Sequence, residues 1–437
     1  MYFQPLRLAL LLTLAHAGTA LGQGLPPDQP ERLGFDAERL SRIDQVMQQY
    51  VDEGQVAGVV TLVLRHGRVA HAGAYGWADR EADRRMTTDA LFRIASQSKA
   101  VTSVAAMTLV EEGRLRLADP VSKFLPGFAA ATVAVPTDTG LARVPVQRPI
   151  TIRGLLTQSA GISYGTDSLV QSQYGPAGLG PAAGFGWYFA DKSEPICVSM
   201  DRLATLPFVA QPGEGFVYGY ATDILGCVVE RVSGQSLEAF FQSRIFEALS
   251  LEDTHFFVPE TDRSRLTAVY AATPNGGIER AAEGQLGQGA YVDGPRVSFS
   301  GGAGLVSTAG DYARFLQMLL NGGMLADARI LGPKTVALMI QDHLDTLYGS
   351  PGYGFGLGFQ VLEDPGLVGQ YGSPGLYSWG GAYATNYWVD PAEQIVGVFM
   401  IQLLPRGGLD LADRFRTLVY QAIVCGGAQR CSQAGAP

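Results

Sequence analysis

The sequence is poor in lysine and histidine, and it has no long block of one charge sign. Only four of its 32 basic side chains are lysines, its formal net charge is −9, and its five histidines lack the spacing of a zinc motif such as H-E-x-x-H. A chain without a basic block is not expected to bind nucleic acid or an anionic membrane. We therefore expect a small-molecule substrate, no metal and no other cofactor, and the oligomeric state stays open.

Long apolar runs are also scarce. The one at residues 8–15 follows Arg7 and precedes several small residues up to Gly22, an order typical of a secretory signal peptide. The run is shorter than the roughly 20 apolar residues that span a bilayer, so an export signal is favoured over a membrane anchor. We predict a signal peptide over residues 1–22 and a periplasmic or secreted protein.

Cysteine is rare, with four in the whole chain. Cys425 and Cys431 lie close together after an export signal, which favours a disulfide between them. Cys197 and Cys227 are far apart, and Cys227 falls in an apolar helical pattern. We expect these two to be small buried side chains without a bridge.

Elements at the two ends of the mature chain predict one folded body over residues 36–437, after an extended lead-in at 23–35. An amphipathic helix is predicted at 36–53 and a β-hairpin at 59–64 and 69–76. Further strands are predicted at 353–362, 383–389 and 395–403, with a helix at 409–424. The two halves of the sheet therefore come from distant parts of the sequence.

The middle of the chain, about residues 115–345, has helical patterns separated by glycine-rich loops. Helices are predicted at 223–233, 237–249 and 311–320, and long surface loops at 165–195 and 271–304. A further helix is predicted from Ser96 to Glu112, ending at Gly113, and its residues are apolar on nearly every side, which is typical of a buried helix.

Ser96-Gln97-Ser98-Lys99 is the only S-x-x-K sequence in the chain. Residues three apart on a helix lie on one face, so Lys99 is expected beside the Ser96 hydroxyl in a buried setting. A desolvated lysine can act as a base, whereas arginine cannot. The alternative, a helix-capping serine followed by a solvated lysine, is weakened because lysine is so rare here.

Two other segments carry candidate site residues. Tyr218 lies on a turn before the predicted helix at 223–233, where its phenol can face a pocket and take part in proton transfer. Ser378-Trp379-Gly380-Gly381-Ala382 opens a predicted strand, and the two glycines allow a ligand to approach the backbone, so that the Ala382 N–H can donate to it.

These three elements, in this order, resemble the serine β-lactamase and penicillin-binding-protein superfamily, and more closely its class C β-lactamase-like family VIII carboxylesterases. The resemblance extends over residues 151–161, 212–234 and 302–311. It implies an α/β fold of the α+β type, with an antiparallel sheet built from the N- and C-terminal segments, flanking helices and an inserted helical region. It also implies that Ser96 is the nucleophile, that Lys99 and Tyr218 share proton transfer, and that the N–H groups of Ser96 and Ala382 form an oxyanion hole.

Two departures from class C β-lactamases concern the substrate. Trp379-Gly380-Gly381 replaces their Lys-Thr-Gly, whose lysine helps to hold the carboxylate of a β-lactam, and Tyr220 replaces an asparagine that contacts the substrate amide. The site is therefore expected to be more apolar and to cleave or transfer the acyl group of small carboxylic esters. The alternatives are a β-lactamase or D-amino-acid peptidase, and a non-catalytic cell-wall-binding protein.

Gly161-Ile162-Ser163-Tyr164-Gly165 matches the G-x-S-x-G nucleophile elbow of another hydrolase fold. That motif needs a strand before it and a helix after it, whereas here a helical pattern precedes it and a glycine-rich loop follows. We interpret it as a loop and not as a second nucleophile.

Overall fold

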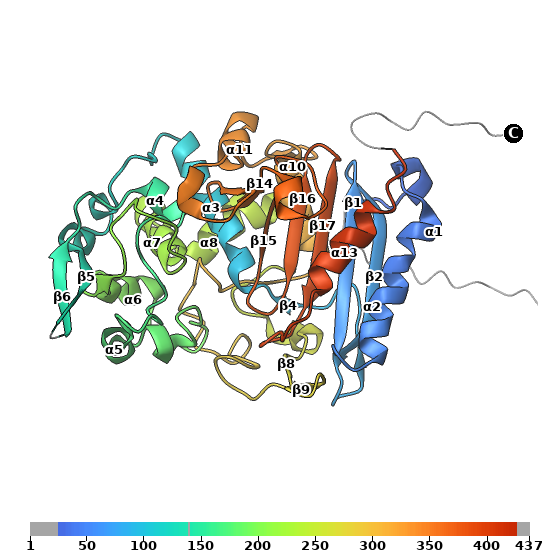
Figure 1. Ribbon diagram of the computed structural model, residues 1–437, viewed down its shortest axis with the longest axis horizontal. Helices are drawn as coiled ribbons and strands as arrows, with labels where there is room; N and C mark the ends of the chain where they lie inside the picture. The colour runs from blue at the N-terminus through green and yellow to red at the C-terminus, as the bar shows by residue number, and fades with distance from the viewer. Residues whose placement is uncertain (1–24, 139, 426–437) are drawn as a thin grey trace, which may run out of the picture.

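The computed structural model of the protein describes residues 25–138 and 140–425. Its centre is an antiparallel sheet of eight strands, in which the N-terminal β1 pairs with the C-terminal β17 (Figure 1). The strands, in spatial order, are β13 (Tyr353–Phe355), β14 (Gln360–Leu362), β15 (Tyr377–Gly380), β16 (Asn386–Asp390), β17 (Ile395–Ile401), β1 (Gly58–Arg65), β2 (Arg68–Asp79) and β3 (Arg84–Arg85). The predicted sheet, built from both ends of the chain, is confirmed.

Strand β1 is buried along its whole length because both faces of the sheet are covered. Its alternate residues belong to different cores: Val60 and Leu62 pack with the helical insert, and Val59 and Val63 pack with the terminal helices. The terminal helices are α1 (Ala37–Leu40), α2 (Arg42–Asp52) and α13 (Leu411–Tyr420), which lie together at one end of the molecule in Figure 1. The predicted helix at 36–53 is thus two helices, which meet at Ser41.

The segment between β3 and β13 supplies the helices that cover the other face. They are α3 (Ser98–Glu111), α4 (Ile152–Leu156), α5 (Gln171–Tyr174), α6 (Ile196–Leu203), α7 (Ala221–Ser233), α8 (Leu237–Phe241), α9 (Glu247–Leu249), α10 (Ala309–Leu320) and α11 (Pro333–Met339). Helix α3 is buried on nearly every side, as its composition predicts, and packs against α7. Helix α12 (Pro365–Val368) lies in the loop between β14 and β15.

Small sheets complete the insert. They comprise β5 (Thr132–Thr137) with β6 (Gly140–Pro145) and β7 (Pro207–Phe208), β4 (Phe92–Arg93) with β10 (Val306–Ser307), β8 (Tyr270–Ala272) with β9 (Ile278–Arg280), and β11 (Met324–Leu325) with β12 (Ala328–Arg329). The predicted loops at 165–195 and 271–304 therefore contain short helices and a hairpin. They are not purely surface loops, since Tyr174, Tyr188 and Tyr291 are almost fully buried.

The expectation of unbridged Cys197 and Cys227 is wrong. The two cysteines form a disulfide between α6 and α7, with their Cα atoms 5.5 Å apart. The loop between these helices folds back and brings together side chains that are 30 residues apart. Cys425 is also disulfide-bonded, and its expected partner, Cys431, lies outside the described residues.

The predicted signal peptide also lies outside the described residues. Within residues 25–138 and 140–425, no helix combines the length and the apolar character needed to cross a bilayer.

Candidate active site

Ser96 lies in a 3₁₀ turn, Ala95–Gln97, immediately before α3. The helix predicted to begin at Ser96 thus begins two residues later. Ala95 has a left-handed backbone with φ of 42°, a conformation that costs a non-glycine residue about 1–3 kcal/mol and that is frequent at functional sites. The Tyr312 hydroxyl donates to the carbonyl of Gln97 at 2.9 Å and holds this turn.

Lys99 lies beneath Ser96 with a side chain that is only 3% exposed. Its Nζ donates to three oxygen atoms: the carbonyl of Gly302 at 2.7 Å, the hydroxyl of Tyr164 at 2.9 Å and the hydroxyl of Ser96 at 3.5 Å. An ammonium group has three hydrogens, so this arrangement uses all of them and aims one at Ser96.

Tyr218 also lies beside Lys99, with the Nζ 4.6 Å from the centre of its ring. The indole Nε1 of Trp379 donates a hydrogen bond to the Tyr218 hydroxyl at 3.1 Å. The fold therefore brings together Ser96, Lys99, Tyr218 and Trp379, four of the residues singled out from the sequence.

Gln158 keeps the segment around Tyr218 in place, a contact that sequence reasoning missed. Its carbonyl accepts from the N–H of Val217 at 2.7 Å and its side-chain oxygen accepts from the N–H of Gly219 at 3.3 Å. Its side-chain nitrogen donates to Thr222 at 2.9 Å. These buried hydrogen bonds fix the position of the backbone that carries the Tyr218 phenol.

Tyr164 is another residue that sequence reasoning missed. It follows Ser163 in the G-x-S-x-G segment, but its hydroxyl faces Lys99, whereas the Ser163 hydroxyl accepts from the N–H of Gly165. Burial, reinforced by Tyr218 and Asp223, raises the pKa of Tyr164 well above its ordinary value. The phenol is therefore neutral, and its oxygen accepts a hydrogen bond from the Lys99 ammonium.

Tyr220 lies behind this group and supports Tyr164. Its ring is fully buried and meets the Tyr164 ring edge-on at 5.3 Å between centres. Its hydroxyl accepts from the N–H of Gly180 at 2.8 Å, and burial raises its pKa. The side chain predicted to contact the substrate thus packs in the core, one layer below Tyr164.

The Trp379-Gly380-Gly381-Ala382 segment runs along the turn that carries Ser96. A Cβ on Gly381 would collide with the Ile94 carbonyl and with the Thr385 side chain, so glycine allows this close approach. Gly380 ends β15, and Ala382 packs in the small cluster that contains Ala95. The two predicted oxyanion-hole residues, Ser96 and Ala382, therefore belong to segments in contact.

Aromatic rings pack together around Tyr218. Phe216 stacks on Tyr218 at 6.2 Å between ring centres and lies 4.8 Å from Tyr348 and 4.9 Å from Phe355, while Phe355 meets Trp379 at 5.4 Å. We call Phe216, Tyr348, Phe355 and Trp379 the aromatic wall. No charged side chain belongs to it, so it favours neutral, apolar groups.

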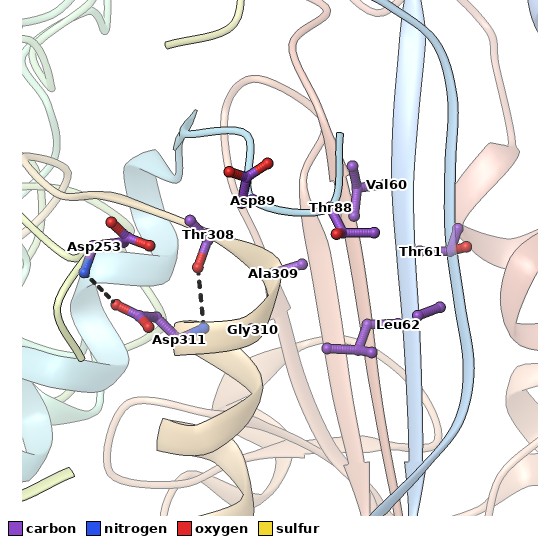
Figure 2. A pocket seen from close by; sticks show the side chains of 11 residues that line it. Val60, Thr61, Leu62, Thr88, Asp89, Asp253, Thr308, Ala309, Gly310 and Asp311 are labelled. Atoms are coloured by element: carbon purple, nitrogen blue, oxygen red, sulfur yellow. Dashed lines mark hydrogen bonds between the residues drawn. The ribbon is translucent and has the colours of Figure 1, made fainter. Parts of the chain in front are cut away.

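Two other polar clusters lie apart from this site. A cavity of about 40 Å³ between β1 and the start of α10 is lined by three aspartates, Asp89, Asp253 and Asp311, and by uncharged residues such as Val60 and Leu62 (Figure 2), but none of the residues around Ser96 lines it. Nearby, ligand atoms of Asp253, His255 and Asp262 lie within 4.8 Å of one another. Arg265 already donates to both carboxylate oxygens of Asp253, at 2.6 and 2.7 Å, so its guanidinium supplies the positive charge in that group.

Comparisons with known proteins identify the family of the chain. The family model described as Beta-lactamase matches residues 43–421, so the chain belongs to that family. It is a serine hydrolase of the β-lactamase superfamily, as the motifs at Ser96, Tyr218 and Trp379 predict.

Its relatives place it near the esterases of that superfamily. It is 31% identical to esterase EstB of Burkholderia gladioli over 83% of this chain and 90% of EstB. It is 32% identical to the lovastatin esterase of Penicillium rubens over 87% of this chain and 98% of that protein. The solved structure of EstCE1, a hydrolase with promiscuous acyltransferase activity, matches with a TM-score of 0.75 and 32% identity, covering 90% of this chain and 99% of that one.

Proposed function

We propose that the protein cleaves small, neutral carboxylic esters through an acyl intermediate on Ser96. The observation that carries the proposal is the buried Lys99, whose ammonium lies 3.5 Å from the Ser96 hydroxyl and faces the Tyr218 ring. A serine beside a buried lysine and a tyrosine phenol is the arrangement that activates a hydroxyl for attack on a carbonyl.

In the first half of the reaction, Tyr218 acts in its phenolate form beside the Lys99 ammonium: its oxygen takes the proton of Ser96, and the Ser96 oxygen attacks the ester carbonyl. The N–H groups of Ser96 and Ala382 donate to the oxyanion that forms. The carbon–oxygen bond to the alcohol then breaks, and the alcohol leaves with the proton that Tyr218 had taken. In the second half, water gives a proton to Tyr218, and the water oxygen attacks the acyl carbonyl. The bond to Ser96 then breaks, the acid leaves, and Tyr218 returns the proton to the Ser96 oxygen.

The aromatic wall supports a neutral substrate. Trp379 stands where class C β-lactamases have a lysine, and its indole donates to Tyr218 at 3.1 Å. Position 379 thus offers an aromatic ring where binding of a lactam carboxylate would need a cation. The esterase names of EstB and of the lovastatin esterase point the same way.

An alcohol can replace water as the acyl acceptor in this scheme, because the second half is the first half run in reverse. The acyltransferase activity in the description of EstCE1 supports testing this route. The non-catalytic alternative is disfavoured because Ser96, Lys99 and Tyr218 are all present and adjacent.

The test is turnover of p-nitrophenyl esters of graded acyl length, with the β-lactam nitrocefin alongside. Short esters are expected to be cleaved, Ser96→Ala is expected to abolish cleavage, and a fluorophosphonate probe is expected to label Ser96. Undiminished ester turnover by the Ser96→Ala variant would overturn the assignment, and nitrocefin turnover as fast as that of the esters would favour a β-lactamase or peptidase.

We also propose export to the periplasm or beyond. The N-terminal segment supports this, and so does the Cys197–Cys227 disulfide, since such bonds persist in oxidising compartments. Fractionation of cells that express the full chain tests it: the enzyme is expected outside the cytoplasm, and its retention in the cytosol would contradict the proposal.

A further inference from the structure

Asp223 is a buried carboxylate behind Lys99 that the proposed reaction does not use. It lies on the first turn of α7, five residues after Tyr218, and is 1% exposed. Its Oδ1 accepts hydrogen bonds from the Ser300 hydroxyl at 2.6 Å and from the Gly302 N–H at 3.0 Å. Its Oδ2 has no hydrogen-bond partner among the described residues.

The turn at residues 300–304 connects this carboxylate to the site. The carbonyl of Gly302 accepts from Lys99 at 2.7 Å, while the N–H of the same residue donates to Asp223. From α3, the Thr102 hydroxyl donates to the Gly301 carbonyl at 2.7 Å. The turn is thus held between α3 and α7, and a shift of Asp223 moves the carbonyl that orients Lys99.

Glycine at position 302 is what allows the carboxylate to come so near. A Cβ there would lie 2.5 Å from Oδ2 of Asp223, which is closer than van der Waals contact allows. The backbone of the turn and the carboxylate are therefore in direct contact, with no side chain between them.

Charge couples the same groups. Burial raises the pKa of Asp223, and the positive charge of Lys99 opposes this by lowering it. The other titratable groups that face this pair are Tyr164, Tyr218 and Tyr220. A single buried charge is costly, so a carboxylate and an ammonium in one interior stabilise each other.

We propose that Asp223 is a positioning residue for the reaction at Ser96, which fixes the Gly302 carbonyl through the turn 300–304 and balances the charge of Lys99. This rests on the proposed acyl transfer and adds the group that holds its lysine. Loss of the carboxylate is expected to slow the chemical step and to leave substrate binding almost unchanged.

Asp223→Asn tests the charge, because its amide oxygen can still accept from Ser300 and Gly302. With p-nitrophenyl acetate, kcat is expected to fall by about tenfold or more, within the range of acid–base contributions. KM is expected to stay within about twofold, since no substrate contact is lost. The profile of kcat against pH is expected to shift, because the negative charge of Asp223 no longer acts on the groups around Ser96.

Asp311→Asn is the matched control, since Asp311 is a carboxylate that is 5% exposed and contacts Asp253 and Thr254 instead of Lys99. Its kcat and pH profile are expected to match those of the parent. If the Asp223 variant keeps the parental kcat and pH profile, or if Asp311→Asn shifts them equally, the proposal is overturned.

Ser300→Ala provides a second test, should Asp223→Asn fail to fold by circular dichroism. It removes one hydrogen bond to the carboxylate and keeps the charge, so kcat is expected to fall by roughly threefold or more at constant KM and with an unmoved pH profile. An unchanged kcat overturns positioning through the turn.

The rate of fluorophosphonate labelling of Ser96 is measured in parallel. A parent protein that is labelled but cleaves no ester refutes the ester assignment. The labelling rates of the parent and the variants then decide the role of Asp223.

Discussion

The Tyr164 hydroxyl is the group whose removal tests the geometry around Lys99 most directly. Tyr164→Phe deletes one oxygen atom, which accepts from Lys99 at 2.9 Å. The ring remains, and its edge-on contacts with Tyr218 and Tyr220, at 5.7 and 5.3 Å between centres, are kept. Lys99 is then left with Ser96 and the Gly302 carbonyl as partners, and its ammonium is free to turn away from Ser96.

The size of the effect follows from the kind of bond. A hydrogen bond to a charged group contributes about 1.5–3 kcal/mol. Because about 1.4 kcal/mol corresponds to a factor of ten in rate, full loss of that energy from the transition state lowers kcat by roughly ten- to a hundredfold. KM is expected to change less, since Tyr164 contacts Lys99 and other tyrosines.

The assay is steady-state hydrolysis of p-nitrophenyl butyrate, with the melting temperature recorded for each variant. Tyr174→Phe is the matched control, because Tyr174 is also an interior tyrosine, donates to the Pro207 carbonyl at 3.1 Å and has no hydrogen bond to Lys99. It is expected to lose some stability and to retain its kcat. A Tyr164→Phe enzyme with kcat within twofold of the parent would refute the role given to this hydroxyl.

Three further outcomes are expected. Trp379→Lys should lower ester turnover and raise the ratio of nitrocefin to ester hydrolysis, because it replaces an aromatic ring by a cation; an unchanged ratio in paired assays would contradict the role of the aromatic wall. Replacing both Cys197 and Cys227 by serine should lower the free energy of unfolding by about 3–4 kcal/mol, the loop-closure value for their separation of 30 residues, and urea denaturation measures it; an unaltered midpoint would argue against the bridge. Burial raises the pKa of Asp311 to about 6, so its contribution to stability is present below its unfolded value and is lost as the pH rises through about 6. Melting temperatures between pH 4 and 7 should therefore fall less steeply in Asp311→Asn, and equal slopes in the two proteins would refute this.

The parts of the site that are local in sequence could be predicted. Ser96 and Lys99 are three residues apart, so helical geometry alone places them side by side. The buried helix that follows could be recognised from composition, because α3 is apolar on nearly every side. The paired glycines before Ala382 likewise indicated close backbone approach, and Gly381 does lie against the Ile94 carbonyl.

The parts that depend on tertiary packing could not be predicted. In the sequence, Tyr164 stands out only as the neighbour of Ser163 in a G-x-S-x-G motif, and nothing in that segment indicates that its phenol contacts Lys99. The Cys197–Cys227 bridge depends on how α6 packs on α7, which spacing does not determine. The single helix expected at 36–53 is instead two helices, because Ser41 ends the first and begins the second. Amphipathic periodicity does not indicate such a division.

The structure also changes what the substitution at position 379 means. From the sequence, Trp379 was significant for the lysine that it replaces, and the inference concerned substrate charge. In the structure its indole belongs to the aromatic wall and donates to the Tyr218 hydroxyl. Substrate choice and the placing of the proton-transfer group are therefore linked through one side chain. Trp379→Lys consequently disturbs Tyr218 as well as adding a cation. Tyr220 stays buried in the core and does not supply the amide contact of the asparagine that it replaces. The variant is therefore expected to lose more ester activity than it gains on lactams.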